Sequence, residues 1–225
     1  MNNSNPTPDD PIPDVSDSTR SAPARETESP AQALSTLRRK MEAVADEFSQ
    51  GKINRAQFNA LYKRYSEQRA IIERLIARNP GSSAWKQVIG VQGQTGFLRQ
   101  HLEAQTLYYA IFHRDNPQML ASGGKQTPDE ALIVPLLKAV WTLPSRPKLG
   151  LGRKQIGATH WLLLAVGDHA STAVMFSLEP AIEQARLVRD LHADFERANQ
   201  AALARGWIVP ERMVFPQRAL VESAF

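Results

Sequence analysis

Cysteine is absent from the 225 residues of this chain, and long apolar runs are absent as well. Without cysteine there can be no disulfide, no thiol nucleophile and no cysteine-ligated metal, which fits a reducing compartment. No uninterrupted apolar run exceeds six residues, the length of the run at residues 161–166, whereas a membrane-spanning helix needs about 20. Met1 is followed by Asn, Ser, Pro and Asp, without the basic and apolar stretches of a secretory signal. We therefore expect a cytoplasmic protein that does not cross a membrane.

Phosphate-binding motifs are missing too, although residues 143–161, LPSRPKLGLGRKQIGATHW, first suggest one. A P-loop needs G-x-x-x-x-G-K-[ST], because its backbone wraps the phosphates before the Lys and the hydroxyl enter a helix. Here the glycine spacing differs and the hydroxyl is missing, and a dinucleotide-binding loop would need a third glycine and a preceding strand. We interpret the segment as a connector. The alternative is a patch for an anionic partner, made of Arg146, Lys148, Arg153 and Lys154.

The histidines do not form a metal-binding pattern. None of the five belongs to a His-x-x-x-His or Glu-x-x-His pair on a predicted helix: they are His101, His113, His160, His169 and His192. The last of them lies two residues from an aspartate on each side, and residues two apart face different sides of a helix. We therefore expect His192 on a solvated helix surface and assign no metal-binding or cofactor-binding residue.

A hydrolase triad has no clear signature either. Asp168 and His169 are expected at the tip of a hairpin, where polar residues are common. Ser171 or Ser177 could complete a triad with them, but no nucleophile elbow surrounds either serine. We assign no catalytic residue and expect a protein that is not an enzyme.

Charge is distributed unevenly along the chain. Residues 1–30 hold six acidic residues and two arginines, a local charge of −4, and six of the fifteen prolines. They carry too little apolar surface to offset the entropy of ordering, so we predict a disordered tail. The remaining residues carry +8, from 25 basic and 17 acidic groups. We interpret this excess as scattered surface charge and keep nucleic-acid binding as a third, weakly supported hypothesis.

Residues 31–79 show the hydrophobic period of two helices. Apolar side chains recur at spacings of three and four in residues 34–48 and again in residues 58–75, which is typical of a heptad seam. Gly51 can end the first helix, and Asn54 can cap the second, with Gln57 completing a capping box. We predict an antiparallel helical hairpin whose seam packs on a second copy or on the domain that follows.

Residues 84–205 alternate between helical and strand patterns. A stretch that is helical at its two ends, 85–105, precedes a predicted β-hairpin whose aromatic residues, Tyr108, Tyr109 and Phe112, suit a core or a dimer contact better than base stacking. A helix then begins in the sequence TPDE, where Thr127 is the expected cap and Pro128 the first helical residue.

Two or three strands follow, of which the last pair turns at residues 167–169, and a final helix is expected from Glu179-Pro180 to about Ala204. This order of elements predicts an α+β fold with a central antiparallel sheet of about five strands flanked by helices.

The segment at 206–225, GWIVPERMVFPQRALVESAF, is too apolar to be left wholly in water. Gly206 ends the preceding helix, and Pro210 and Pro216 prevent a new helix across the segment. We predict an extended strap that buries Trp207 and Phe215 against the sheet or against the hairpin seam.

Two resemblances follow from these patterns. FSQGKINRAQFNALYKRY, with Gly51, Ile53, Asn54 and Phe58, resembles the short helical hairpins of the SHOCT type. YYAIFHRDNPQMLASGG and HWLLLAVGDHASTAVMFSLEP resemble the first and last hairpins of the roadblock, or dynein-light-chain-type, family with its profilin-like fold, over roughly residues 85–205. The first resemblance implies an oligomerising or partner-binding accessory. The second implies a non-enzymatic homodimer that scaffolds or regulates small GTPases.

The leading hypothesis is therefore a homodimeric interaction module with a small GTPase as a candidate partner and no cofactor. The alternative is a domain that senses a small molecule in a buried cavity, with His160 or Gln155 among its polar groups.

Overall fold

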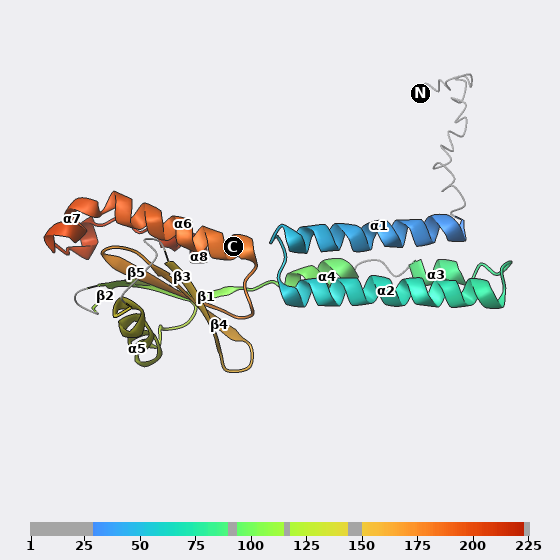
Figure 1. The fold of residues 1–225 in the computed structure, drawn as a ribbon, viewed down its shortest axis with the longest axis horizontal. Helices are drawn as coiled ribbons and strands as arrows, with labels where there is room; N and C mark the ends of the chain where they lie inside the picture. The colour runs from blue at the N-terminus through green and yellow to red at the C-terminus, as the bar shows by residue number, and fades with distance from the viewer. Residues whose placement is uncertain (1–28, 90–93, 115–117, 144–149, 223–225) are drawn as a thin grey trace, which may run out of the picture.

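The computed structural model of the chain describes residues 29–89, 94–114, 118–143 and 150–222. It has an α+β fold in which a five-stranded antiparallel sheet follows a helical pair, as the order of elements predicted (Figure 1). The tail expected at residues 1–30 lies outside the described residues up to residue 28. Residues 29 and 30 instead begin the first helix, because Ser29 caps it in a capping box with Gln32.

The helical hairpin consists of α1, Pro30–Ser49, and α2, Arg55–Arg78. Gly51 has the positive φ of +80° that the turn requires. Asn54 caps α2, and its side chain and that of Gln57 form the predicted capping box, with both N···O distances 2.9 Å. The buried core of the hairpin contains most of the predicted seam, with Ala33 in addition: Ala33, Leu37, Met41, Val44, Leu61, Tyr65 and Ile72. Leu34, Phe58 and Leu75 of the predicted seam are partly buried, and Phe48 is 36% exposed.

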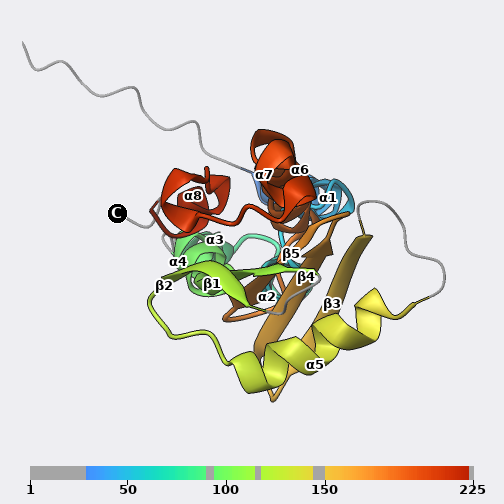
Figure 2. The same cartoon turned by 90° about the vertical axis from the view of Figure 1, so that its left-hand side faces the viewer.

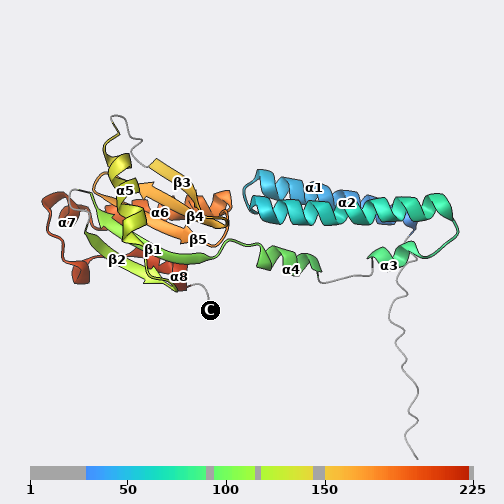
Figure 3. The same cartoon turned by 90° about the horizontal axis from the view of Figure 1, so that it is seen from below.

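Two short helices, α3 (Trp85–Ile89) and α4 (Gln94–His101), pack against α2 (Figure 3). Trp85 is buried in the core of the hairpin. The capping residues of α2 also bind the chain at α4, because Gln57 Nε2 donates to the Arg99 carbonyl and Asn54 Nδ2 to the Leu102 carbonyl, each at 2.7 Å. The chain immediately after the hairpin therefore covers part of its seam.

The sheet contains β1 (Thr106–His113), β2 (Met119–Gly124), β3 (Gly150–Ile156), β4 (His160–Val166) and β5 (Ala170–Phe176). Their order across the sheet is β2-β1-β5-β4-β3, which leaves β2 and β3 at the edges. The turn predicted at residues 167–169 joins β4 to β5, with Gly167 N donating to the Ala170 carbonyl at 3.0 Å. The predicted turn residues 115–117 lie outside the described residues.

Helices cover both faces of the sheet. The helix α5, Glu130–Trp141, lies on one face, and α6, Ile182–Ala198, lies on the other (Figure 2). Side chains of β1 alternate between the two layers, so that Tyr108 and Phe112 pack on the α5 side and Tyr109 on the α6 side. The aromatic residues of β1 are thus core residues, one of the two roles expected for them.

The start of α5 differs from the prediction. Asp129, not Thr127, caps the helix, and its carboxylate accepts the Leu132 N–H at 3.2 Å. A carboxylate interacts favourably with the positive end of the helix dipole, which explains why the cap falls two residues later.

The prediction of a single final helix that reaches about Ala204 is also wrong, because the helix is interrupted. It starts at Ile182, and Asn199 interrupts it before α7, Gln200–Arg205. The Asn199 side chain binds both backbone groups of Val214, with distances of 2.8 and 2.9 Å. This tertiary contact competes with continuation of the helix.

The C-terminal segment folds back on the sheet beside α6. The sheet is one of the two surfaces that the sequence predicted for it. The segment forms helical turns rather than an extended strap: η1 (Pro210–Arg212), η2 (Pro216–Arg218) and α8 (Ala219–Glu222). Phe215 is buried and its ring stacks on Phe195 with centroids 5.7 Å apart. Trp207, however, is 67% exposed, so the prediction that it is buried is wrong.

Candidate interaction surfaces

The glycine-containing segment that first resembled a phosphate loop enters the edge strand β3. Arg153 and Lys154 lie on this strand, where they pair with Leu163 and Leu162 of β4 and therefore point to opposite faces of the sheet. Arg153 also pairs with Glu179 at 3.4 Å. Arg146 and Lys148 lie outside the described residues. The two described members of the predicted anionic-partner patch thus do not share a face.

The candidate triad residues have other partners. Ser171 Oγ accepts the Trp141 indole N–H at 2.9 Å, and Ser177 Oγ accepts the Gln105 N–H at 2.9 Å. The N–H groups of the turn at 168–170 donate to the Glu196 carboxylate at 2.8–3.1 Å. Within the described residues, no hydrogen bond joins either serine to a histidine, and no group of three or more His, Asp or Glu is placed to hold a metal.

His192 is the histidine whose position was predicted wrongly. It is fully buried, and its Nδ1 lies 2.9 Å from Oγ1 of Thr172 on β5. Burial lowers its pKa from the ordinary value of 6.5, and the nearby Glu196 partly opposes this shift. A spacing of four from Val188 was the available signal, because that spacing puts both side chains on one helix face.

An apolar groove lies between the end of α5 and the edge of the sheet. Its volume is about 200 Å³, and its lining comes from both elements: Val140, Leu143, Gly150, Leu151, Gly152, Leu164 and Val166. The two glycines pair with Val166 and Leu164 and so lie on the side of β3 that faces α5. A Cβ at Gly152 would have no neighbour closer than 3.9 Å. The missing side chains of the two glycines therefore create the groove.

The groove continues into a free sheet edge. Strand β3 pairs with β4 alone among the described strands. Leu143, at the rim, is 51% exposed, and Leu151 between the glycines is 40% exposed. Sequence reasoning treated these glycines as turn residues and missed the surface. Glycines at alternate positions of a strand were the signal, because they leave one face without side chains.

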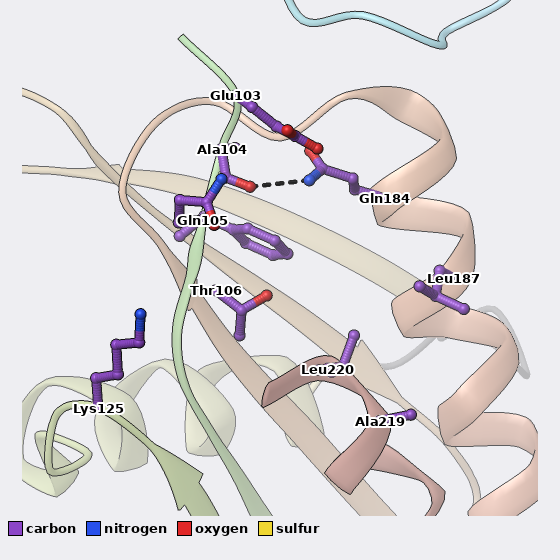
Figure 4. A pocket seen from close by; sticks show the side chains of 10 residues that line it. Glu103, Ala104, Gln105, Thr106, Lys125, Gln184, Leu187, Ala219 and Leu220 are labelled. Carbon is purple, nitrogen blue, oxygen red and sulfur yellow. Dashed lines mark hydrogen bonds between the residues drawn. The ribbon is translucent and has the colours of Figure 1, made fainter. Parts of the chain in front are cut away.

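A second cavity, of about 240 Å³, opens to solvent between α6 and α8, beside the chain that enters β1 (Figure 4). Gln184 Nε2 donates to the Ala104 carbonyl at 2.9 Å in its wall. His160 and Gln155, the residues named for a ligand cavity, are exposed and do not line it. The ligand-sensing alternative therefore loses the polar groups on which it rested.

Comparisons with known protein families, with curated proteins and with solved structures find no match to this chain. In the described part of the chain, no helix has the length and apolar content needed to span a bilayer.

Proposed function

We propose that this protein is a non-enzymatic interaction module that acts as a homodimer, and that the edge of β3 and the adjoining α5 groove form its dimer contact. The observation that carries the proposal is the combination of an edge strand that is unpaired on one side among the described strands with an apolar groove and a half-exposed leucine at its rim. A free edge presents backbone donors and acceptors that a second strand can pair with.

A second copy is the occupant that this geometry favours. Two β3 edges related by a two-fold axis would pair antiparallel, so the same surface would serve both partners. Such pairing would bring the two α5 grooves to the same interface, where Leu143 of each copy could be buried. Burying an exposed leucine stabilises a contact by about 1.5–3 kcal/mol at most, so two copies of this residue contribute substantially.

A small GTPase is our proposed external partner. Its support is the resemblance of the two hairpins to the roadblock family, together with the order of one helical stretch, two strands, a helix, three strands and a helix. The two described basic residues of β3 lie on opposite faces of the sheet, so a basic stripe for nucleic acid gains no support from them.

Light scattering on the purified protein tests the homodimer. We expect a mass twice that of the 25.0 kDa chain. Leu143→Arg should shift the protein toward monomer, because a guanidinium in the groove would be buried without a partner. The matched control is Leu187→Arg on α6, where the leucine is also 51% exposed, and this variant should remain dimeric.

The variant Ile71→Arg on α2 distinguishes dimerisation through β3 from dimerisation through the hairpin. We expect this variant to remain dimeric. A wild-type protein that is monomeric at tens of micromolar would disprove the homodimer, because a Kd above this concentration is too weak for an obligate assembly. If Ile71→Arg dissociates the dimer and Leu143→Arg does not, the dimer contact is formed by the hairpin and not by β3.

A further inference from the structure

A second apolar groove lies at the end of the sheet domain farthest from the hairpin, where α7 meets the C-terminal segment (Figure 1). Its volume is about 310 Å³, and its lining includes Ala202, Arg205, Trp207, Val209, Arg212 and Met213. Trp207 is 67% exposed, and Val209 is exposed beside it. Tryptophan and arginine are the residues that most often dominate the binding energy of protein interfaces.

The backbone holds Trp207 in place although its side chain is exposed. Gly206 adopts a φ of +66° at the end of α7, and the Trp207 N–H donates to the Ala202 carbonyl at 3.0 Å. On the other side of the groove, Asn199 fixes the backbone of Val214. A groove with a fixed backbone loses little conformational entropy when it binds a partner.

The charge of the groove points to an acidic partner. The Arg205 guanidinium lies 5.3 Å from the centroid of the Trp207 ring. Within the described residues neither Arg205 nor Arg212 pairs with a carboxylate. Residues 199–218 carry three arginines and one glutamate, a charge of +2. Both cations are therefore available to carboxylates from another segment.

We propose that this groove binds residues 9–17 of the same protein, DDPIPDVSD. This segment carries four aspartates and no basic residue, and it has two prolines with Ile12 between them and Val15 after the second. Proline-rich segments dock on exposed aromatic side chains because little entropy is lost when a stiff backbone binds. The aspartates would face Arg205 and Arg212, while a proline or Ile12 would pack on Trp207.

The docked segment belongs to a second copy. Ile12 lies seventeen positions before residue 29, and this stretch can span about 60 Å at most. The start of α6 contacts the turn after α1, since Glu183 N donates to the Gly51 carbonyl at 3.0 Å, and the two helices continue in the same direction along the molecule (Figure 1). Their 20 and 17 residues together extend about 55 Å. The segment could reach the groove of its own chain only if almost the whole stretch were fully extended, which costs conformational entropy, so the segment of a second copy is the favoured occupant.

A labelled synthetic peptide of residues 7–19 tests the proposal by fluorescence anisotropy against the full-length protein. We expect saturable binding that weakens when the salt concentration rises from about 0.05 to 0.5 M, because the ion pairs are exposed to solvent. Trp207→Ala should weaken binding at least about tenfold, and so should the double variant Arg205→Glu, Arg212→Glu. A peptide with all four aspartates changed to asparagine should bind as weakly as these variants.

Phe97→Ala is the matched control, because Phe97 is 62% exposed but lies on α4. This variant should bind the peptide like the wild type. Circular dichroism melting of each variant shows whether its fold is intact. Two results would overturn the proposal. One is undetectable binding of the peptide to the wild type at millimolar protein, which means a binding free energy weaker than about 4 kcal/mol. The other is equal affinity of the peptide for the wild type and for Trp207→Ala. The result is independent of the β3 contact, which Leu143→Arg tests separately.

Discussion

His192 is a polar side chain held inside the sheet domain. Thr172 Oγ1 accepts a hydrogen bond from Gln217 Nε2 at 3.2 Å and lies 2.9 Å from His192 Nδ1. His192 Nδ1 and Thr172 Oγ1 share one hydrogen bond whose direction depends on the tautomer of the neutral ring, and Nε2 has no partner among the described residues. Burial lowers the pKa of this ring, so the ring remains neutral near pH 7. This explains how a histidine can occupy the core without an ion pair.

The burial of His192 predicts a loss of stability in mild acid. The unfolded chain binds a proton near the ordinary pKa of 6.5, whereas the folded ring binds it only at lower pH. The free energy of unfolding should therefore fall as the pH drops below 6.5, by up to about 1.4 kcal/mol per pH unit from this group. Urea unfolding at pH 7.5 and pH 5.5 measures the difference.

The variant His192→Gln should show a smaller difference between the two pH values, although its stability is lower at both. His101→Gln, which changes an exposed histidine, should retain the difference seen in the wild type. If His192→Gln and the wild type lose the same stability in acid, other groups cause the loss.

The C-terminal segment acts as a structural element of the sheet domain, although little of it is regular. Together with α6 it covers one face of the sheet, where it buries Phe215, while Met213, Leu220 and Val221 pack around the same core. Asn199 joins the segment to α6 through the backbone of Val214. The segment therefore contributes to the core in the same way as a helix.

Deletion of residues 207–225 should destabilise the protein, because it exposes Phe195 and the sheet face to water. Phe215→Ala isolates the packing part of this effect and should cost about 3–5 kcal/mol, or a fall of roughly 10 °C in melting temperature. Thermal unfolding followed by circular dichroism measures both changes.

Trp207→Ala is the control for the same segment. Its side chain is largely exposed in the monomer, so the melting temperature should change little. A truncated protein that melts like the intact chain and stays soluble would show that the segment is a docking element rather than part of the core.

Among the described residues, the hairpin meets the sheet domain at the turn after α1 (Figure 1). Gly51 approaches Ile182, and Glu179 lies between Arg55 of α2, at 3.6 Å, and Arg153 of β3, at 3.4 Å. The Glu183 N–H donates to the Gly51 carbonyl, so the same turn closes the hairpin and positions the start of α6. This turn couples the two parts of the molecule.

Gly51→Ala should disturb this coupling more than a glycine substitution elsewhere. A Cβ at Gly51 would lie 2.6 Å from Ile182 Cβ, whereas a Cβ at Gly206 would have no neighbour within 4 Å. Both glycines have a positive φ, so each alanine costs about 1 kcal/mol of backbone strain. Gly51→Ala should cost 1–2 kcal/mol more than Gly206→Ala, at roughly the scale of an overpacked contact, in urea unfolding experiments. Equal costs would mean that the hairpin and α6 separate freely in solution.

The sequence by itself determined the features that depend on neighbouring residues. The heptad seam, the capping box of Asn54 and Gln57, the turn at Gly51 and the order of strands and helices all depend on interactions within a few positions of the chain. The sequence also excluded a P-loop through spacing alone, and the glycine-containing segment forms a strand. These patterns were sufficient for the fold class and for the absence of known catalytic motifs.

Tertiary structure alone decided which side chains are buried and which surfaces are free. Asn199 ends α6 because Val214 lies beside it, and His192 is buried because its face of α6 packs on Thr172 of β5. Phe215 enters the core while Trp207 stays exposed, although both occur in one apolar segment. The groove at Gly150 and Gly152 exists because β3 is an edge strand next to α5. Each outcome depends on residues far apart in the chain, whose contacts local periodicity does not specify.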